Sequence, residues 1–166
     1  MKGCSSASDI PKANENSRIL PAAPAFFLTG DQIMFNKVSH IGIAVTDLQA
    51  STELFSNLFG KKPDHIEDVP DQKVKTALFT VGSSSIELTQ GTDSSSPITR
   101  FLEKRGEGVH HVSFMVDDIE RELVRLKGAG FQLIDERPRV GADGYLVAFL
   151  HPQSTNGVLI EISQKK

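Results

Sequence analysis

The sequence predicts an α+β fold in which two tandem β-α-β-β-β modules form one curved mixed sheet shaped as a cup. The first observation behind this prediction is an internal repeat, because residues 38–48 read VSHIGIAVTDL and residues 109–119 read VHHVSFMVDDI. The second is a matching pair further along each half, IELTQ at 86–90 and IEISQ at 160–164. Both pairs alternate apolar residues as strands do, and helical spacing appears between them.

Histidine and glutamate occupy equivalent places in the two halves. His40 aligns with His111, 71 residues later, and Glu87 aligns with Glu161, 74 residues later. The two offsets differ by only 3 residues, which is the size of a loop insertion. The order of histidine strand, helix, further strands and glutamate strand therefore occurs twice.

In the first half, the segment from Asp47 to Phe59 is predicted to be an amphipathic helix. It has an aspartate near its start, apolar residues at helical spacing and Gly60 directly after it. Residues 75–81 are strand-like and lead toward the glutamate strand.

In the second half, Ile119, Leu123 and Leu126 recur at i, i+4 and i+7 and predict the corresponding helix, which glycines end. Residues 145–150 are strand-like. A further short helix is expected at 96–104, where a serine caps the helix and a proline takes the first turn. That helix joins the two modules.

Residues 36–166 are predicted to form a single domain, with the repeats at about 37–92 and 107–164. Residues 1–35 are rich in Ser, Ala, Pro and Asn, lack helix or strand periodicity and are expected to be a disordered leader. A transit peptide is the alternative, although Asp9 and Glu15 count against it. Met34 stands just before the first patterned segment and is a candidate start.

Composition excludes several classes of function. The formal net charge is -3 and the pI is about 5.9, whereas a nucleic-acid-binding protein should show a basic stripe. No apolar run approaches the roughly 20 residues of a membrane span. The single cysteine, Cys4, allows no internal disulfide and fits a reducing compartment. The expected location is the cytoplasm, or the mitochondrial matrix if the source is eukaryotic.

The paired residues suit a metal site. Side chains alternate across a strand, so His40 and His111 lie on the face opposite the core-forming Ile and Val residues, and so do Glu87 and Glu161. Curved on itself, that face makes a polar cup. Two imidazoles and two carboxylates suit Mn, Fe(II), Co, Ni or Zn better than Mg or Ca. We therefore expect one divalent ion held by these four residues.

The other histidines are interpreted differently. His110 is displaced by one residue from His111 and is expected to point to the opposite face, so the repeat alignment selects His111. His65 has no partner in the second repeat and is interpreted as a surface residue. His151 stands in a His-Pro turn and is a candidate for the site entrance.

These motifs resemble the vicinal oxygen chelate superfamily, which includes glyoxalase I, fosfomycin-resistance proteins, extradiol dioxygenases and methylmalonyl-CoA epimerase. From about residue 36 to residue 164 the chain is similar to the epimerase family. The similar stretches are SHIGIAVTDL (39–48), VGSSSIELTQ (81–90), SPITRFLEKRGEGVHHVSFMVDDIE (96–120), DERPRVGADG (135–144) and AFLHPQSTNGVLIEI (148–162).

The resemblance implies an enzyme of propionyl-CoA metabolism that interconverts (2R)- and (2S)-methylmalonyl-CoA by C2 proton abstraction through a metal-stabilised enolate. The implied cofactor is one divalent transition metal ion, Co2+, Ni2+, Mn2+ or Zn2+. The implied partners are a small acyl-CoA substrate and a second copy in a homodimer, with no nucleic acid and no membrane. The alternatives are a glyoxalase I type lactoylglutathione lyase and a non-catalytic binding protein of the same fold.

The resemblance also assigns roles to residues. His40, His111 and Glu161 fall on the family's metal ligands, and Glu87 falls on a fourth position that is Gln in some relatives. Glu161 is also implied as one acid/base. Some bacterial relatives carry the second acid/base where this chain has Thr76, so Glu87 becomes its first candidate. Glu67 is less favoured because it is expected in a loop.

The substrate-binding residues are less specified. Arg139 and Gly144 belong to a glycine-containing turn that could meet phosphate or carboxylate groups, as could the nearby Arg137. Ser154 and Thr155 precede the last strand and are candidates to donate hydrogen bonds to the substrate carboxylate.

Overall fold

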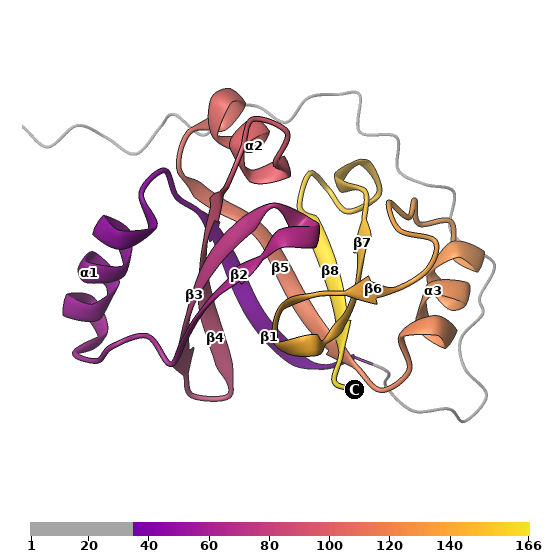
Figure 1. Cartoon of the computed structure of the whole chain (residues 1–166). Coiled ribbons are helices and arrows are strands. Elements are labelled where there is room, and N and C mark those ends of the chain that lie inside the picture. Colours follow the sequence, from indigo (N-terminus) through magenta and orange to yellow (C-terminus); the bar gives the residue numbers. More distant parts are fainter. Residues whose placement is uncertain (1–34) are drawn as a thin grey trace, which may run out of the picture.

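The computed structural model describes residues 35–166, which form one sheet with three helices (Figure 1). The strands are β1 (Phe35–Ala44), β2 (His65–Val69), β3 (Val74–Val81), β4 (Ser84–Gly91), β5 (Gly108–Val116), β6 (Arg139–Val140), β7 (Leu146–Leu150) and β8 (Leu159–Gln164). The helices are α1 (Leu48–Phe59), α2 (Pro97–Arg105) and α3 (Ile119–Gly128), and three short 3-10 turns are η1 (Pro70–Gln72), η2 (Ala142–Gly144) and η3 (Pro152–Ser154).

The two predicted modules are confirmed. The first runs β1-α1-β2-β3-β4, the second runs β5-α3-β6-β7-β8, and α2 connects them. The order across the sheet is β2-β3-β4-β1-β5-β8-β7-β6, so the modules join where β1 pairs antiparallel with β5. Parallel pairing of β1 with β4 and of β5 with β8 makes the sheet mixed, as predicted. The limits of the domain stay a prediction. Residues 1–34 of the predicted leader, Met34 included, lie outside the described residues, whereas Phe35 begins β1.

The helices begin where side chains can cap them. Asp47 and Asp118 accept hydrogen bonds from amides three residues on, at the starts of α1 and α3. Ser96 accepts from the amide two residues on, at the start of α2. Each side chain satisfies an amide that has no partner within its helix. Gly60 follows α1 with a φ of 67°, a left-handed conformation that favours glycine.

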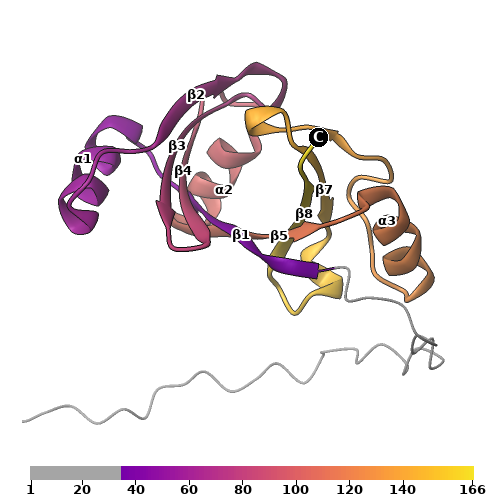
Figure 2. The ribbon, with the colours of Figure 1, turned by 90° about the horizontal axis from the view of Figure 1, so that it is seen from below.

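The outer face of the curved sheet carries the two larger apolar cores. Phe55 and Phe59 of α1 pack on Phe79 of β3, and Leu123 and Leu126 of α3 pack on the β7-β8 side. Figure 2 shows these two helices on the outside of the curve, at opposite ends of the sheet. A third, smaller apolar cluster of Ala44, Val74 and Ile98 packs with α2 on the inner face. The rest of the inner face carries the polar side chains of the site.

The two edges of the sheet are linked across its open side. Glu67 of β2 accepts a hydrogen bond from the amide of Asp143 in η2 at 2.9 Å. His65 Nε2 lies 3.3 Å from a carboxylate oxygen of each of these residues. Glu67 was expected in a loop, and that prediction is wrong. It lies on strand β2, which pairs with β3 from His65 to Val69. His65 is partly exposed, as expected for a surface residue.

Within residues 35–166, no helix is both long enough and apolar enough to span a membrane.

Candidate metal centre and active site

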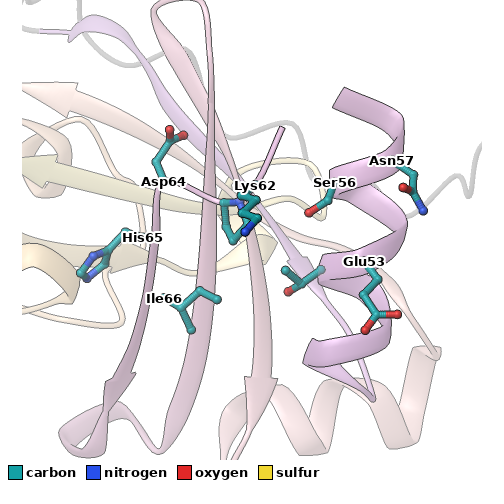
Figure 3. A pocket seen from close by; sticks show the side chains of 9 residues that line it. Glu53, Ser56, Asn57, Lys62, Asp64, His65 and Ile66 are labelled. Atoms are coloured by element: carbon teal, nitrogen blue, oxygen red, sulfur yellow. The ribbon is translucent and has the colours of Figure 1, made fainter. Parts of the chain in front are cut away.

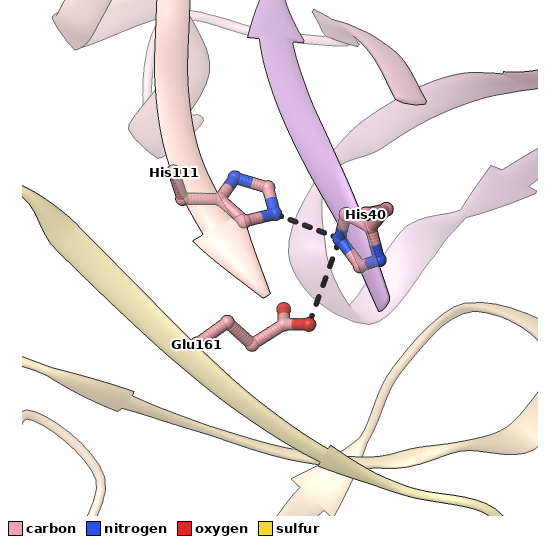
Figure 4. Close-up of side chains that lie close together, drawn as sticks. All are labelled: His40, His111 and Glu161. Carbon is pink, nitrogen blue, oxygen red and sulfur yellow. Dashed lines mark hydrogen bonds and ion pairs between the residues drawn. The ribbon is translucent and has the colours of Figure 1, made fainter. Parts of the chain in front are cut away.

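The four predicted ligands converge on the inner face of the sheet. His40 comes from β1 and His111 from β5, and their Nε2 atoms lie 3.0 Å apart (Figure 4). Glu161 Oε1 lies 3.6 Å from His40 Nε2. Glu87 Oε2 lies 3.8 Å from His40 Nε2 and 4.0 Å from His111 Nε2. Each repeat thus contributes one imidazole and one carboxylate to a common point.

This donor set fits a single transition metal ion. Ligand atoms of His40, His111 and Glu161 all lie within 4.8 Å of one another. Ligands bound to a first-row ion at about 2.1 Å lie roughly 3.0–3.5 Å apart. The observed spacings are close to that range. A carboxyl oxygen of Glu87 lies next to this group, 3.8 Å from His40 Nε2 and 4.0 Å from His111 Nε2. His111 and Glu161 are each only 5% exposed, so water does not compete freely for the donors.

Strand pairing explains why these side chains meet. Gly42 of β1 lies beside both Glu87 and His111 in the sheet. Ser113 of β5 lies beside both Glu161 and His40. A small residue thus lies between two of the candidate ligands on each of the central strands β1 and β5. A Cβ at Gly42 would lie 2.1 Å from His111 Cε1, so the His111 ring occupies the space that a side chain there would need.

Hydroxyl groups orient the two carboxyls. Ser113 Oγ donates to Glu161 Oε1 at 2.7 Å, and Thr89 Oγ1 donates to Glu87 Oε2 at 3.1 Å. Ser163 occupies the place in the second repeat that Thr89 has in the first, and its Oγ lies 3.2 Å from Ser113 Oγ. These bonds fix which oxygen of each carboxyl faces the histidines.

Burial raises the pKa of both carboxyls. The pKa of Glu161 rises from 4.5 to about 7 because burial disfavours its charged form, against the lowering effect of His40. The pKa of Glu87 also rises to about 7 through burial, and the nearby charges of Glu67 and Asp143 add to the shift. Burial lowers the pKa of His40 and, more strongly, that of His111. The two carboxyls are thus suited to exchange protons near neutral pH.

His110 does not point away from the site, which corrects the prediction made from strand alternation. Its Nδ1 lies 3.0 Å from Nδ1 of His111, and its side chain lines the same cavity. The reason is a β-bulge: Gly42 pairs with His111 and Ile43 with Val109, so His110 is an extra residue in β5. A bulge breaks the strict alternation on which the prediction rested. Burial lowers the pKa of His110 to about 4.

The four ligands open into a cavity of about 520 Å³ on the inner face of the sheet. Ligand pockets are commonly about 300–1,000 Å³, so a sizeable part of a small organic molecule fits here. Thr76, where some relatives are expected to carry an acid/base, is buried and lines the cavity, as do Met115, Tyr145 and Phe149. Polar ligands at the floor and mixed apolar walls suit a substrate with a reactive polar end.

The predicted substrate-binding residues divide into two groups. Arg139 lines the cavity, where its guanidinium lies 5.3 Å from the ring centre of Phe149. Gly144 ends the η2 turn and does not line the cavity, although its neighbours Asp143 and Tyr145 do. Ser154 and Thr155 are not brought to the site, because the Ser154 hydroxyl donates to the carbonyl of His151 and the Thr155 hydroxyl to that of Val158, both within their own loop. His151 caps that loop and does not line the cavity. Its assignment to the site entrance is therefore not supported.

A second pocket lies away from the four ligands. It is an open depression of about 820 Å³ between α1 and β2, where Glu53, Lys62 and Ile66 lie (Figure 3). It holds none of the paired histidines and carboxyls. We therefore assign the chemistry to the inner cavity.

The raised pKa of Glu87 predicts a pH-dependent stability for the metal-free chain. Between pH 4.5 and about 7 the folded state binds more protons than the unfolded state, so stability falls as pH rises through this window. Glu87→Gln removes this effect. Above pH 7 the metal-free variant should be more stable than wild type by up to about 3 kcal/mol, with little difference below pH 4.5. Urea unfolding in EDTA from pH 4 to 8 measures this, and a difference independent of pH would contradict it.

Comparisons with known proteins agree with this architecture. The sequence model of the Glyoxalase/Bleomycin resistance protein/Dioxygenase superfamily matches residues 39–149. The uncharacterized protein YqjC of Bacillus subtilis is 40% identical over 79% of this chain and 94% of its own length. The ethylmalonyl-CoA/methylmalonyl-CoA epimerase of Cereibacter sphaeroides is 38% identical over 79% of this chain and 99% of its own length.

A solved structure of a methylmalonyl-CoA epimerase in complex with methylmalonyl-CoA and NH4+ superposes with a TM-score of 0.76 at 31% identity, covering 79% of this chain and 95% of that one. The family matched by the sequence, the extent of the similarity and the cup-shaped fold all agree. The chain belongs to the methylmalonyl-CoA epimerase family of the Glyoxalase/Bleomycin resistance protein/Dioxygenase superfamily.

Proposed function

We propose that the chain is a metal-dependent epimerase that interconverts (2R)- and (2S)-methylmalonyl-CoA. The observation that carries the proposal is a pair of buried carboxyls, Glu87 and Glu161, contributed by opposite repeats to a site with two histidines. Inverting a carbon centre needs one proton acceptor and one proton donor on opposite faces of the substrate. Two carboxyls related by the internal repeat meet that need. Family membership and the methylmalonyl-CoA complex of a relative support the choice of substrate.

The acidic proton lies on C2, between the thioester and the carboxylate of the substrate. Glu161 in its ionised form removes this proton, and the electron pair of the broken C–H bond delocalises onto the thioester oxygen as an enolate. Glu87 in its protonated form then donates a proton to the opposite face of C2, which inverts the centre. The reverse reaction exchanges the two roles. In the metal-free site burial raises the pKa of both carboxyls to about 7, which suits each of them to act as acid or base near neutral pH.

His40, His111, Glu161 and Glu87 would hold the metal ion. When bound, a divalent transition ion supplies positive charge beside the developing enolate oxygen. The hydroxyls of Ser113 and Thr89 hold the two carboxyls in place, because each donates to the carboxyl oxygen that faces the histidines. Arg139 at the cavity wall is a candidate to bind a negatively charged part of the substrate.

The direct test is an epimerase assay on each stereoisomer of methylmalonyl-CoA with Co2+, Ni2+, Mn2+ and Zn2+ in turn. We expect interconversion with at least one of these ions, together with solvent deuterium incorporation at C2. The glutathione thiohemiacetal of methylglyoxal, assayed in parallel, tests the lactoylglutathione lyase alternative. Turnover of the thiohemiacetal alone, or turnover of neither substrate, would overturn the proposal.

Metal binding should also stabilise the fold. An ion that binds only the folded chain adds about 2.7 kcal/mol at a concentration one hundred times its Kd. We therefore expect the melting temperature of the EDTA-treated chain to rise by several degrees when the activating ion is added. His40→Ala should abolish this rise, whereas His65→Ala, at the partly exposed cluster on the sheet edge, should keep it. Equal responses of the two variants would place the ion elsewhere.

The homodimer and the cytoplasmic location remain predictions, to be measured by sedimentation of the purified chain and by cell fractionation.

A further inference from the structure

The bulge in β5 brings a third histidine into contact with the candidate metal centre. His110 Nδ1 lies 3.0 Å from His111 Nδ1, on the side of the His111 ring opposite its Nε2. His111 Nε2 in turn lies 3.0 Å from His40 Nε2. The three rings therefore form a continuous chain of nitrogen contacts, which runs from His110 through His111 to His40.

Packing holds this chain of rings in place. His110 meets the ring of Phe101 in α2 edge-on, with ring centres 4.9 Å apart. His111 meets Phe149 of β7 in the same way at 5.7 Å and fills the space above Gly42. These contacts hold the two rings in the orientation in which their Nδ1 atoms face each other.

Two nitrogens at this distance share one proton, which leaves two arrangements. If His110 donates, a neutral His111 carries its remaining proton on Nε2 and has no lone pair for a metal ion. If His111 donates through Nδ1–H, its Nε2 lone pair faces the site. In this arrangement His40 donates its Nε2–H to that lone pair in the metal-free chain, and an ion bound by both rings displaces this proton. Carboxyl oxygens of Glu161 and Glu87 lie 3.6 and 3.8 Å from His40 Nε2. Carboxyl oxygens carry partial negative charge whether or not they are ionised, so an N–H among them is favourable and the second arrangement is preferred.

We propose that His110 is a positioning residue, which accepts a hydrogen bond from His111 Nδ1–H and so keeps the Nε2 lone pair of His111 directed into the site before any ion binds. This role rests on the proposed function, because the lone pair matters only for a metal ion. Metal-binding histidines commonly donate their second ring nitrogen to a carboxylate, a carbonyl or water, and that contact fixes the tautomer. Here a neighbouring imidazole takes that place.

The test compares His110→Leu, which keeps an apolar packing partner but removes the acceptor, with His110→Asn, whose amide oxygen can accept in place of Nδ1. Long-range 1H–15N spectra of the metal-free chain report which nitrogen of His111 carries the proton. Wild type and His110→Asn should show Nδ1–H. His110→Leu should lose this single tautomer, and its affinity for Zn2+ by competition titration should fall about tenfold or more.

The outcomes separate this proposal from the proposed function. If His110→Leu retains the Nδ1–H tautomer and wild-type Zn2+ affinity, His110 has only a packing role and the proposal is wrong. The proposal also fails if wild-type His111 carries its proton on Nε2. If wild type shows the expected tautomer yet no ion supports epimerisation, the tautomer assignment stands and the proposed function fails.

Discussion

Replacing Glu161 by Gln is expected to slow epimerisation by about a thousandfold or more, because one side chain loses both its proton-transfer role and its charge. The Gln amide keeps the shape of the carboxyl and can still accept the Ser113 hydroxyl, which donates at 2.7 Å in the wild type. The fold should therefore persist, with a circular dichroism spectrum like that of wild type. Steady-state turnover of each stereoisomer, with metal content measured on the same sample, gives the result.

Solvent exchange distinguishes proton transfer from ligand loss. In deuterated solvent, Glu161→Gln loaded with metal should fail to exchange the C2 proton of one stereoisomer, and Glu87→Gln that of the other. Glu136→Gln is the matched control, because that carboxyl is 69% exposed and pairs with Lys127 on the surface. It should retain wild-type turnover. If metal-loaded Glu161→Gln and Glu87→Gln exchanged both stereoisomers at the wild-type rate, the two carboxyls would not be the acid and the base.

Gly42→Ala is expected to disable the site through a single methyl group. The new Cβ would lie 2.1 Å from Cε1 and 2.4 Å from Nδ1 of His111, so the ring must move. Because packed strands surround this ring, overpacking should cost about 1–3 kcal/mol of stability. Displacement of a ligand should lower metal affinity at least about tenfold and epimerase turnover with it. Urea unfolding and metal titration measure the two effects.

The matched control is Gly128→Ala at the end of α3, where an added Cβ meets nothing within 4 Å. Alanine favours a helix over glycine, so this variant should be as stable as wild type or slightly more so and should bind metal normally. If both variants behaved like wild type, the His111 ring would not depend on the space above Gly42.

The repeat made the fold and the convergence of the four ligands predictable. Because His40 and His111 hold equivalent places on the two central strands, one alignment located both, and Glu87 and Glu161 followed on the strands that pair beside them. Local chemistry also located the helix starts, since Asp47 and Ser96 cap as their residue types predict. These features follow from periodicity and from short-range hydrogen bonding, both of which are visible in a sequence.

What could not be predicted depends on strand register. Strand alternation predicts that the His110 side chain points away from the site. The bulge that places it in the site is visible only in the pairing of β5 with β1. Glu67 gave no strand signal because β2 is a short edge strand rich in charge. Its contact with Asp143 joins residues 76 positions apart. The hydroxyls of Ser154 and Thr155 were candidates by residue type, yet the turn they form uses both of them internally.

The division of ligands between the repeats has a consequence for how such a site can arise. A chain of one repeat would supply one histidine and one glutamate, too few to hold an ion firmly. Two such chains would have to associate along the strand that corresponds to β1 or β5, and ion binding would then depend on their concentration. Joining the halves through α2 makes the site intramolecular. It also allows the sequence of each half to vary independently of the other. Gly42 can therefore lie beside His111 while Ser113 lies beside His40.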